Sequence, residues 1–202
     1  MRKGLPIYIG SRYNLTVIFK NIFVLSPGRS GSKSFVEATS HLTNYSSAHE
    51  SRAARLGDER FNFPQFHIEA DNRLIWFHGE MSKRFSGEDV LYIHLKRDFD
   101  DTVDSFLHRL RNSNYRSSIM TAFSHGILMK PKDWKEEEEP KLAQFYVETI
   151  HSNISDFLSN KKHLVVHLQD GGESFDAFLD AIDAEGDLQK ARETWKQIHN
   201  AR

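Results

Sequence analysis

The sequence has no cysteine among its 202 residues. This absence excludes disulfide bridges, thiolate catalysis and zinc sites built on sulfur. Long apolar runs are missing as well, since Ser11, Arg12, Tyr13 and Asn14 interrupt the N-terminal segment. A signal peptide needs about 7–15 apolar residues in succession, and a membrane helix needs about 20. We therefore expect a cytoplasmic protein without a membrane span.

An excess of charge of one sign is also missing. The formal net charge is −1 at pH 7, so the chain has no general attraction for nucleic acid or an anionic membrane. Hydrophobic residues make up 39% of the chain and charged residues 27%, which is typical of a globular domain. A chain of this length forms one domain with a real core, so we expect a single domain over residues 1–202.

Short apolar segments alternate with longer segments that have the periodicity of helices. The predicted strands cover residues 21–25, 45–49, 66–69, 90–95 and 163–168. The predicted helices cover residues 32–42, 74–85, 100–111, 142–158, 175–182 and 188–198. Strands separated by helices form a mostly parallel sheet, because each crossover needs the length of a helix. The sequence therefore predicts a three-layer α/β fold of the P-loop type, with ligands at the carboxyl ends of the strands.

The loop after the first predicted strand has the composition of an anion-binding site. Its glycines let the backbone approach a ligand with no Cβ in the way. The start of the next helix supplies free N–H groups and the positive end of the helix dipole, which favour a phosphate or a sulfate. The residues of this loop predicted to bind the ligand are Gly28, Arg29, Ser30, Gly31, Ser32, Lys33 and Ser34.

The ATP-binding pattern G-x-x-x-x-G-K-[ST] matches this loop poorly. Lys33 and Ser34 match its last pair, but Pro27 and Ser32 stand where the two glycines belong. The loop thus indicates an anion site and leaves a P-loop kinase open as an alternative. A kinase needs Lys33 on the phosphates and an acidic residue after a strand to handle Mg²⁺, for which Asp170 is the candidate.

The segment Arg29-Ser30-Gly31-Ser32 resembles the 5′-phosphosulfate loop of sulfotransferases that use 3′-phosphoadenosine 5′-phosphosulfate (PAPS). Arg at the first position is similar to the bacterial, Golgi-carbohydrate and tyrosylprotein branches of that family. A second segment resembles the family's 3′-phosphate motif, with Arg97 after an apolar strand and Ser105 eight residues later. Arginine offers a fork of donors to this phosphate, which ATP lacks. The resemblance implies that Arg97 and Ser105 bind it.

The resemblance also implies a reaction. PAPS would be the donor and PAP the product, with no metal involved. The acceptor would be a hydroxyl or amine of a carbohydrate, lipid, peptide or small metabolite, and not a nucleic acid. Whether the chain forms a homodimer stays open, and a non-catalytic nucleotide-binding module on the same fold is a second alternative.

Sulfuryl transfer needs stabilisation of developing charge and a base for the acceptor hydroxyl. Arg29 is the predicted source of charge stabilisation. The resemblance favours Glu50 as the base, with His49 as its neighbour. His78 and Glu69 are the other two candidates for the base.

The segment 112–134 follows the predicted 3′-phosphate helix. Family members place acceptor-binding or lid elements at this point of the chain. The resemblance therefore implies that Tyr115, Arg116 and Trp134 contact the acceptor.

Overall fold

The computed structural model describes residues 18–112, 119–130 and 135–197. A five-stranded parallel sheet lies at its centre, in the order β2-β3-β1-β4-β5. The strands are β1 (Asn21–Leu25), β2 (Ser46–His49), β3 (His67–Ala70), β4 (Val90–Lys96) and β5 (His163–His167). Because all the strands run in one direction, their carboxyl ends meet at one edge of the sheet.

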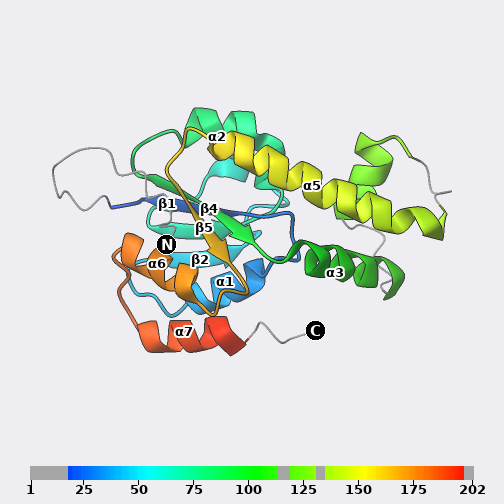
Figure 1. The fold of residues 1–202 in the computed structure, drawn as a ribbon. Helices are drawn as coiled ribbons and strands as arrows, with labels where there is room; N and C mark the ends of the chain where they lie inside the picture. Colours follow the sequence, from blue (N-terminus) through cyan, green and yellow to red (C-terminus); the bar gives the residue numbers. More distant parts are fainter. Residues whose placement is uncertain (1–17, 113–118, 131–134, 198–202) are drawn as a thin grey trace.

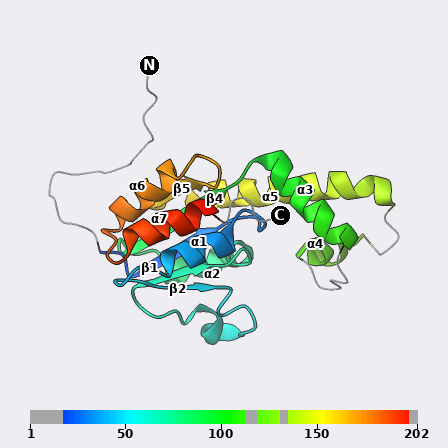
Figure 2. The ribbon, with the colours of Figure 1, turned by 90° about the horizontal axis from the view of Figure 1, so that it is seen from below.

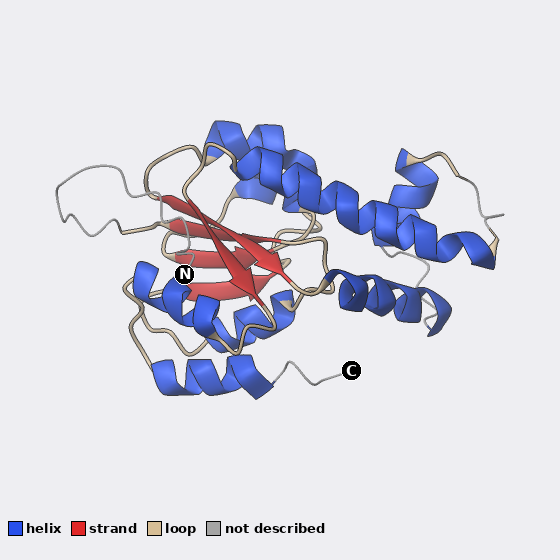
Figure 3. Cartoon of the chain, in the orientation of Figure 1, coloured by secondary structure: helices blue, strands red, loops and turns tan. Residues whose placement is uncertain are grey.

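Helices cover both faces of the sheet, as Figures 1 and 3 show. One face carries α1 (Ser32–Thr39), α6 (Glu173–Ala181) and α7 (Leu188–Gln197), which Figure 2 shows in front of the strands. The opposite face carries α2 (His78–Arg84) and α5 (Glu139–Leu158). The three-layer α/β arrangement predicted from the sequence is therefore confirmed.

Two buried clusters hold the layers together, one on each face of the sheet. Ile22 and Val24 of β1 enter the cluster beneath α1, α6 and α7, whereas Phe23 enters the cluster beneath α2 and α5. In the first cluster the rings of Phe175 and Trp195 stack with their centroids 4.9 Å apart. A register slip of one residue would exchange the two sets of side chains, so burial on both faces fixes the register.

Helix α3 (Phe99–Asn112) follows β4 directly and extends with α5 beyond the sheet (Figure 1). Arg111 Nε of α3 pairs with Glu139 Oε2 of α5 at 3.0 Å. The short helix α4 (Ile119–Ala122) and a π-helical turn (Phe123–Ile127) pack on the outer half of α5 through Phe123 and Tyr146. Although α5 has 20 residues, no helix in the described ranges is long and apolar enough to cross a membrane.

The segment 74–85 differs most from its predicted form. In place of one helix, the chain makes a 3₁₀ turn (Leu74–Phe77) and then α2. The tighter turn buries Leu74 and Ile75 directly after β3 while Phe77 stays 42% exposed. Two more 3₁₀ turns, Gly57–Phe61 and Glu136–Glu138, were not predicted.

Candidate functional site

The loop between β1 and α1, residues 26–31, is called the β1 loop below. It lies at the carboxyl edge of the sheet and turns through two glycines, Gly28 with φ +90° and Gly31 with φ +91°. A Cβ on Gly31 would lie 2.5 Å from Leu168 Cδ1, and one on Gly28 would lie 2.7 Å from Asn72 Nδ2. Both positions therefore require glycine, as the sequence predicts.

Hydrogen bonds fix the β1 loop against the body of the protein. Ser30 Oγ donates to Gly28 O at 3.1 Å, and both residues are buried. Pro27 O accepts from Tyr146 Oη of α5 at 2.8 Å and from Asn72 Nδ2 at 3.4 Å. The carbonyl of Pro27 is thereby turned toward the interior.

The amino end of α1 completes this part of the edge. Gly31 is its N-cap, and among the described residues no side chain caps this end. The first-turn N–H groups of a helix have no partner within the helix, so they are available to an anion. Lys33 is exposed on this turn, whereas Ser34 is buried. The arrangement fits the predicted anion site.

Two predicted motifs that are far apart in the sequence meet at this edge. Arg29 Nε of the β1 loop donates to Ser105 Oγ of α3 at 2.9 Å. Arg97, just after β4, donates from Nη1 to Arg29 O at 3.2 Å. Partial burial, followed by the charges of Arg109 and Arg97, lowers the pKa of the Arg29 guanidinium. The guanidinium groups of Arg97 and Arg109 therefore lie near that of Arg29, which itself contacts Ser105.

Other contacts at the start of α3 position Arg97. Asp98 Oδ1 accepts from the backbone N–H of Asp101 at 3.1 Å, which caps the helix. Gln169, just after β5, accepts from the backbone N–H of Asp98 at 2.7 Å. The ion pair of Arg97 with Asp101 is loose, at 3.8 Å. The ends of β1 and β4, with α3, form what we call the β1–β4 half of the edge.

The ends of β2 and β3 form the β2–β3 half. His49 is the last residue of β2, and its Nε2 lies 3.0 Å from Ser32 Oγ at the start of α1. Glu50 follows with φ +52°, and its Oε1 pairs with Arg73 Nη1 at 2.7 Å. The same Arg73 nitrogen lies 3.2 Å from Asn72 Oδ1. The structure thus brings Glu50 to the edge, next to the β1 loop.

Glu69 has a different environment. Its side chain is fully buried, and it accepts hydrogen bonds from Ser51 N at 2.8 Å and Ser51 Oγ at 2.6 Å. The ring of His67 lies 3.1 Å away on the same carboxylate. These bonds tie β3 to the segment after β2, which is a structural role.

His78 does not lie at this edge. Its side chain is exposed at the start of α2, and its ring packs edge-on against Phe157 at a centroid distance of 6.5 Å. Phe157 lies in the last turn of α5, which leads into the amino end of β5. This contact places His78 against the last turn of α5, and no contact joins it to the β1 loop among the described interactions. The predicted acceptor contacts Tyr115, Arg116 and Trp134 lie outside the described residues.

Several residues at the edge were missed by the sequence reasoning. Asp71, just after β3, forms a buried ion pair with Arg60 at 2.5 Å. Burial raises the pKa of the Asp71 carboxyl, and the charge of Arg60 opposes that shift. The rule that ligands gather after strand ends points to Asp71, Asn72 and Arg73. Arg109 lies one helical turn after Ser105, a spacing that places both on one face of α3.

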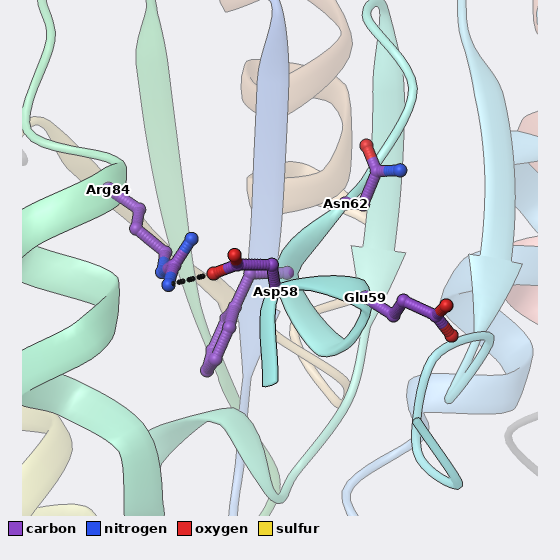
Figure 4. Close-up of a pocket in the computed structure, with 5 residues that line it drawn as sticks. Asp58, Glu59, Asn62 and Arg84 are labelled. Carbon is purple, nitrogen blue, oxygen red and sulfur yellow. Dashed lines mark hydrogen bonds and ion pairs between the residues drawn. The ribbon is translucent and has the colours of Figure 1, made fainter. Parts of the chain in front are cut away.

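A hollow on the described surface lies away from this edge. It has a volume of about 300 Å³ and is lined by Asp58, Glu59, Phe61, Asn62 and Arg84 (Figure 4). Arg84 is already paired with Asp58 at 2.6 Å and with Glu80 at 2.9 Å. Within the described ranges, no group of three or more histidine and acidic residues is arranged to hold a metal ion.

Comparison with known proteins identifies the fold. No family model and no curated protein matches the sequence. A solved sulfotransferase from Alicyclobacillus acidocaldarius aligns with a TM-score of 0.53 and 11% identity, covering 85% of this chain and 83% of its own. Mouse sulfotransferase SULT7A1, solved in complex with PAP, aligns with a TM-score of 0.53 and 16% identity, covering 89% of this chain and 67% of its own. The chain therefore has the fold seen in these sulfotransferases.

Proposed function

We propose that this protein transfers the sulfuryl group of PAPS to a hydroxyl or amine of an acceptor. One observation carries the proposal: the Arg29 side chain bonds to Ser105, and Arg97 bonds to the Arg29 backbone. The β1 loop and the Arg97–Ser105 motif thereby form one cationic site. Such a site suits a nucleotide with phosphates at both the 5′ and 3′ positions.

Each part of the site has a proposed role toward the donor. The β1 loop and the amino end of α1 would hold the 5′-phosphosulfate, and Arg97 with Ser105 would hold the 3′-phosphate. Arg29 would stabilise the charge that develops as the sulfuryl group leaves. Lys33, exposed on the first turn of α1, would add charge at the same end. An Arg at position 29 favours the bacterial, Golgi-carbohydrate and tyrosylprotein branches.

The β2–β3 half faces the reacting end of this donor. An in-line transfer forms a bond from the acceptor oxygen or nitrogen to sulfur and breaks the bond from sulfur to the 5′-phosphate. The acceptor proton goes to a base, and PAP leaves with the electron pair of the broken bond. Among the predicted bases at this edge, the Glu50 side chain is 31% exposed whereas that of Glu69 is fully buried, and His49, next to Glu50, lies there as well.

The kinase alternative is weakened by the position of Asp170. Burial raises the pKa of this carboxyl, but hydrogen bonds from Ser174 and from the Gly172 backbone outweigh burial and lower the pKa. Both carboxylate oxygens accept backbone N–H groups at the start of α6, at 3.0 and 2.9 Å. Asp170 therefore caps a helix, which is not the role that a kinase requires of it.

Thermal unfolding with added ligands tests the donor. A ligand that binds the native state raises the Tm, and tighter binding raises it further. We expect PAP to raise the Tm more than ADP does, because ADP has no 3′-phosphate. A larger rise with ATP–Mg²⁺ than with PAP would support the kinase and overturn the proposal.

Arg97→Ala tests the 3′-phosphate assignment. Loss of a charge-assisted hydrogen bond should weaken PAP binding by about 2 kcal/mol, roughly 30-fold in Kd, and leave ADP binding nearly unchanged. The control is Arg111→Ala, the same substitution on α3 at a guanidinium that pairs with Glu139. Equal losses for PAP and ADP would show that the assignment is wrong.

A further inference from the structure

The contact between His49 and Ser32 joins the two halves of the edge. Ser32 is the first residue of α1, next to the β1 loop, and its Oγ lies 3.0 Å from Nε2 of His49. His49 is half-buried at the end of β2. If the phosphosulfate occupies the β1 loop, this contact brings the imidazole next to the donor at the first turn of α1.

Glu50 is held in a different way. Its Oε1 lies 2.7 Å from Arg73 Nη1, and the same nitrogen lies 3.2 Å from Asn72 Oδ1. Asn72 in turn donates to Pro27 O of the β1 loop at 3.4 Å. This chain of contacts fixes Glu50 as the carboxylate of an ion pair. An ion pair of this kind can hold an acceptor in place. Its carboxylate oxygen already binds the Arg73 guanidinium, which makes it a weaker base.

Partial burial favours the neutral form of the His49 ring. Burial is the largest influence, and it lowers the pKa of the imidazole below the usual 6.5. Lys33 on α1 also lowers this pKa, while Glu50, Asp71 and Glu69 raise it. Because burial dominates, the ring is unprotonated at neutral pH, which is the form that accepts a proton.

Building on the proposed function, we infer that Nε2 of His49 takes the acceptor proton, while the Glu50–Arg73 pair positions the acceptor. The acceptor oxygen bonds to sulfur, the bond from sulfur to the 5′-phosphate of PAPS breaks, and the proton moves to Nε2. The electron pair of the broken bond stays on the departing PAP, so atoms and charge balance. His49 then returns the proton to water when PAP leaves.

Ser32 is a positioning residue in this scheme. Its hydroxyl meets Nε2, the atom that must receive the proton. When PAPS occupies the β1 loop, the Ser32 hydroxyl can donate to its phosphosulfate oxygens. Nε2 of His49 is then free to take the proton of the acceptor. Ser32→Ala should therefore lower turnover several-fold and keep its pH dependence, and Ser32→Thr should restore turnover.

The release of PAP from PAPS, with water as the acceptor, provides the first test. General-base catalysis contributes about 100-fold or more, so His49→Asn should lose about that factor. In wild type the rate should rise with pH to a plateau, with a midpoint below pH 6.5, and His49→Asn should lose this rise. His41→Asn is the matched control, since His41 makes the same kind of contact, 3.0 Å from Thr194 Oγ1, between the end of α1 and α7.

Glu50→Gln separates this inference from the proposed function. If His49 is the base, the rate of PAP release in Glu50→Gln should still rise with pH as it does in wild type. If Glu50→Gln abolishes the rise and His49→Asn keeps it, Glu50 is the base and the inference fails, although the sulfotransferase proposal stands. If wild type fails to bind PAP in the thermal assay, the proposed function itself fails.

A second measurement needs no turnover. The imidazole ¹³Cε1–¹H signal of His49, assigned through His49→Asn, should shift when PAP is added, and the signal of His41 should not. An unchanged His49 signal in PAP-saturated protein would overturn the inference. If wild type binds PAP but releases none from PAPS, the non-catalytic module gains support and this signal decides whether His49 contacts the donor site.

Discussion

The two halves of the carboxyl edge handle charge in opposite ways. In the β1–β4 half, Arg29, Arg97 and Arg109 lie close enough together that their charges lower the pKa of Arg29. In the β2–β3 half, Glu50 is paired with Arg73 and Asp71 with Arg60. The first half therefore gains from an anionic ligand, while the second holds its shape through its own ion pairs. Like charges gathered in the first half and opposite charges paired in the second distinguish the proposed donor site from the segments that support it.

Asp71→Ala should give the largest effect, because it breaks the supporting wall. The Arg60 side chain is 4% exposed, so the substitution leaves a buried charge without its partner. We expect unfolding free energy to fall by about 3–5 kcal/mol, measured by urea denaturation. Asp58→Ala, which breaks the exposed pair with Arg84, is the control and should cost at most about 1 kcal/mol. Equal losses for the two variants would contradict the distinction between the halves.

Gly31→Ala should damage the β1–β4 half through its backbone. The residue has φ +91°, and its new Cβ would meet Leu168 at 2.5 Å. We expect a loss of about 1–3 kcal/mol in unfolding free energy and loss of PAP binding in the thermal assay. Gly79→Ala in α2 is the control: a Cβ added there would have nothing within 4 Å, so stability should be unchanged or raised. PAP binding that survives in Gly31→Ala would show that the loop tolerates a side chain.

Mild acid should destabilise the strand that supports Arg97. His94 of β4 and His151 of α5 lie 2.8 Å apart, and burial lowers their pKa values to about 3 and about 4. Their unfolded forms bind protons below about pH 6.5 and the folded forms do not, so stability falls as pH drops from 6.5 toward 4. We expect a loss of about 1–2 kcal/mol between pH 6.5 and 5.5 in urea denaturation. His94→Gln should flatten this slope, and an unchanged slope would contradict the assignment.

Asn72→Ala should give the smallest effect, because it removes a weak link between the halves. Its amide donates to Pro27 O at 3.4 Å, and that carbonyl keeps a second donor in Tyr146 at 2.8 Å. We expect a loss of about 0.5–1 kcal/mol in stability and a few-fold weaker PAP binding. A loss as large as that of Asp71→Ala would mean that the two halves are not independent.

The site residues that a single sequence can suggest lie close together in the chain. Gly28 to Ser34 are consecutive in the β1 loop and the first turn of α1, and Ser105 follows Arg97 by eight residues, so both groups can be found from the sequence alone. The pairing of Glu50 with Arg73, and of Arg60 with Asp71, depends on how β2 and β3 lie side by side. A single sequence does not give that register, because many carboxylates and cations are available to pair.

The base candidates show the same limit. Glu69, like Glu50, lies at the end of a predicted strand, but its side chain is buried and accepts hydrogen bonds from Ser51. His78 lies between the two motifs in the chain, but the 3₁₀ turn before α2 leaves its ring against Phe157 of α5. Helix and strand periodicity predicted the elements, and the side-chain directions at their ends needed the packed structure.

The bond from Tyr146 to Pro27 has a consequence for how the protein is made. It joins residues 119 positions apart, and Gly31 packs against Leu168, which is more distant still. The β1 loop is translated early, but it cannot take its final shape until α5 and the end of β5 have left the ribosome and docked. A nascent chain released before that point has the residues of the proposed donor site without their arrangement, so PAP binding at that site would report completed folding of the sheet.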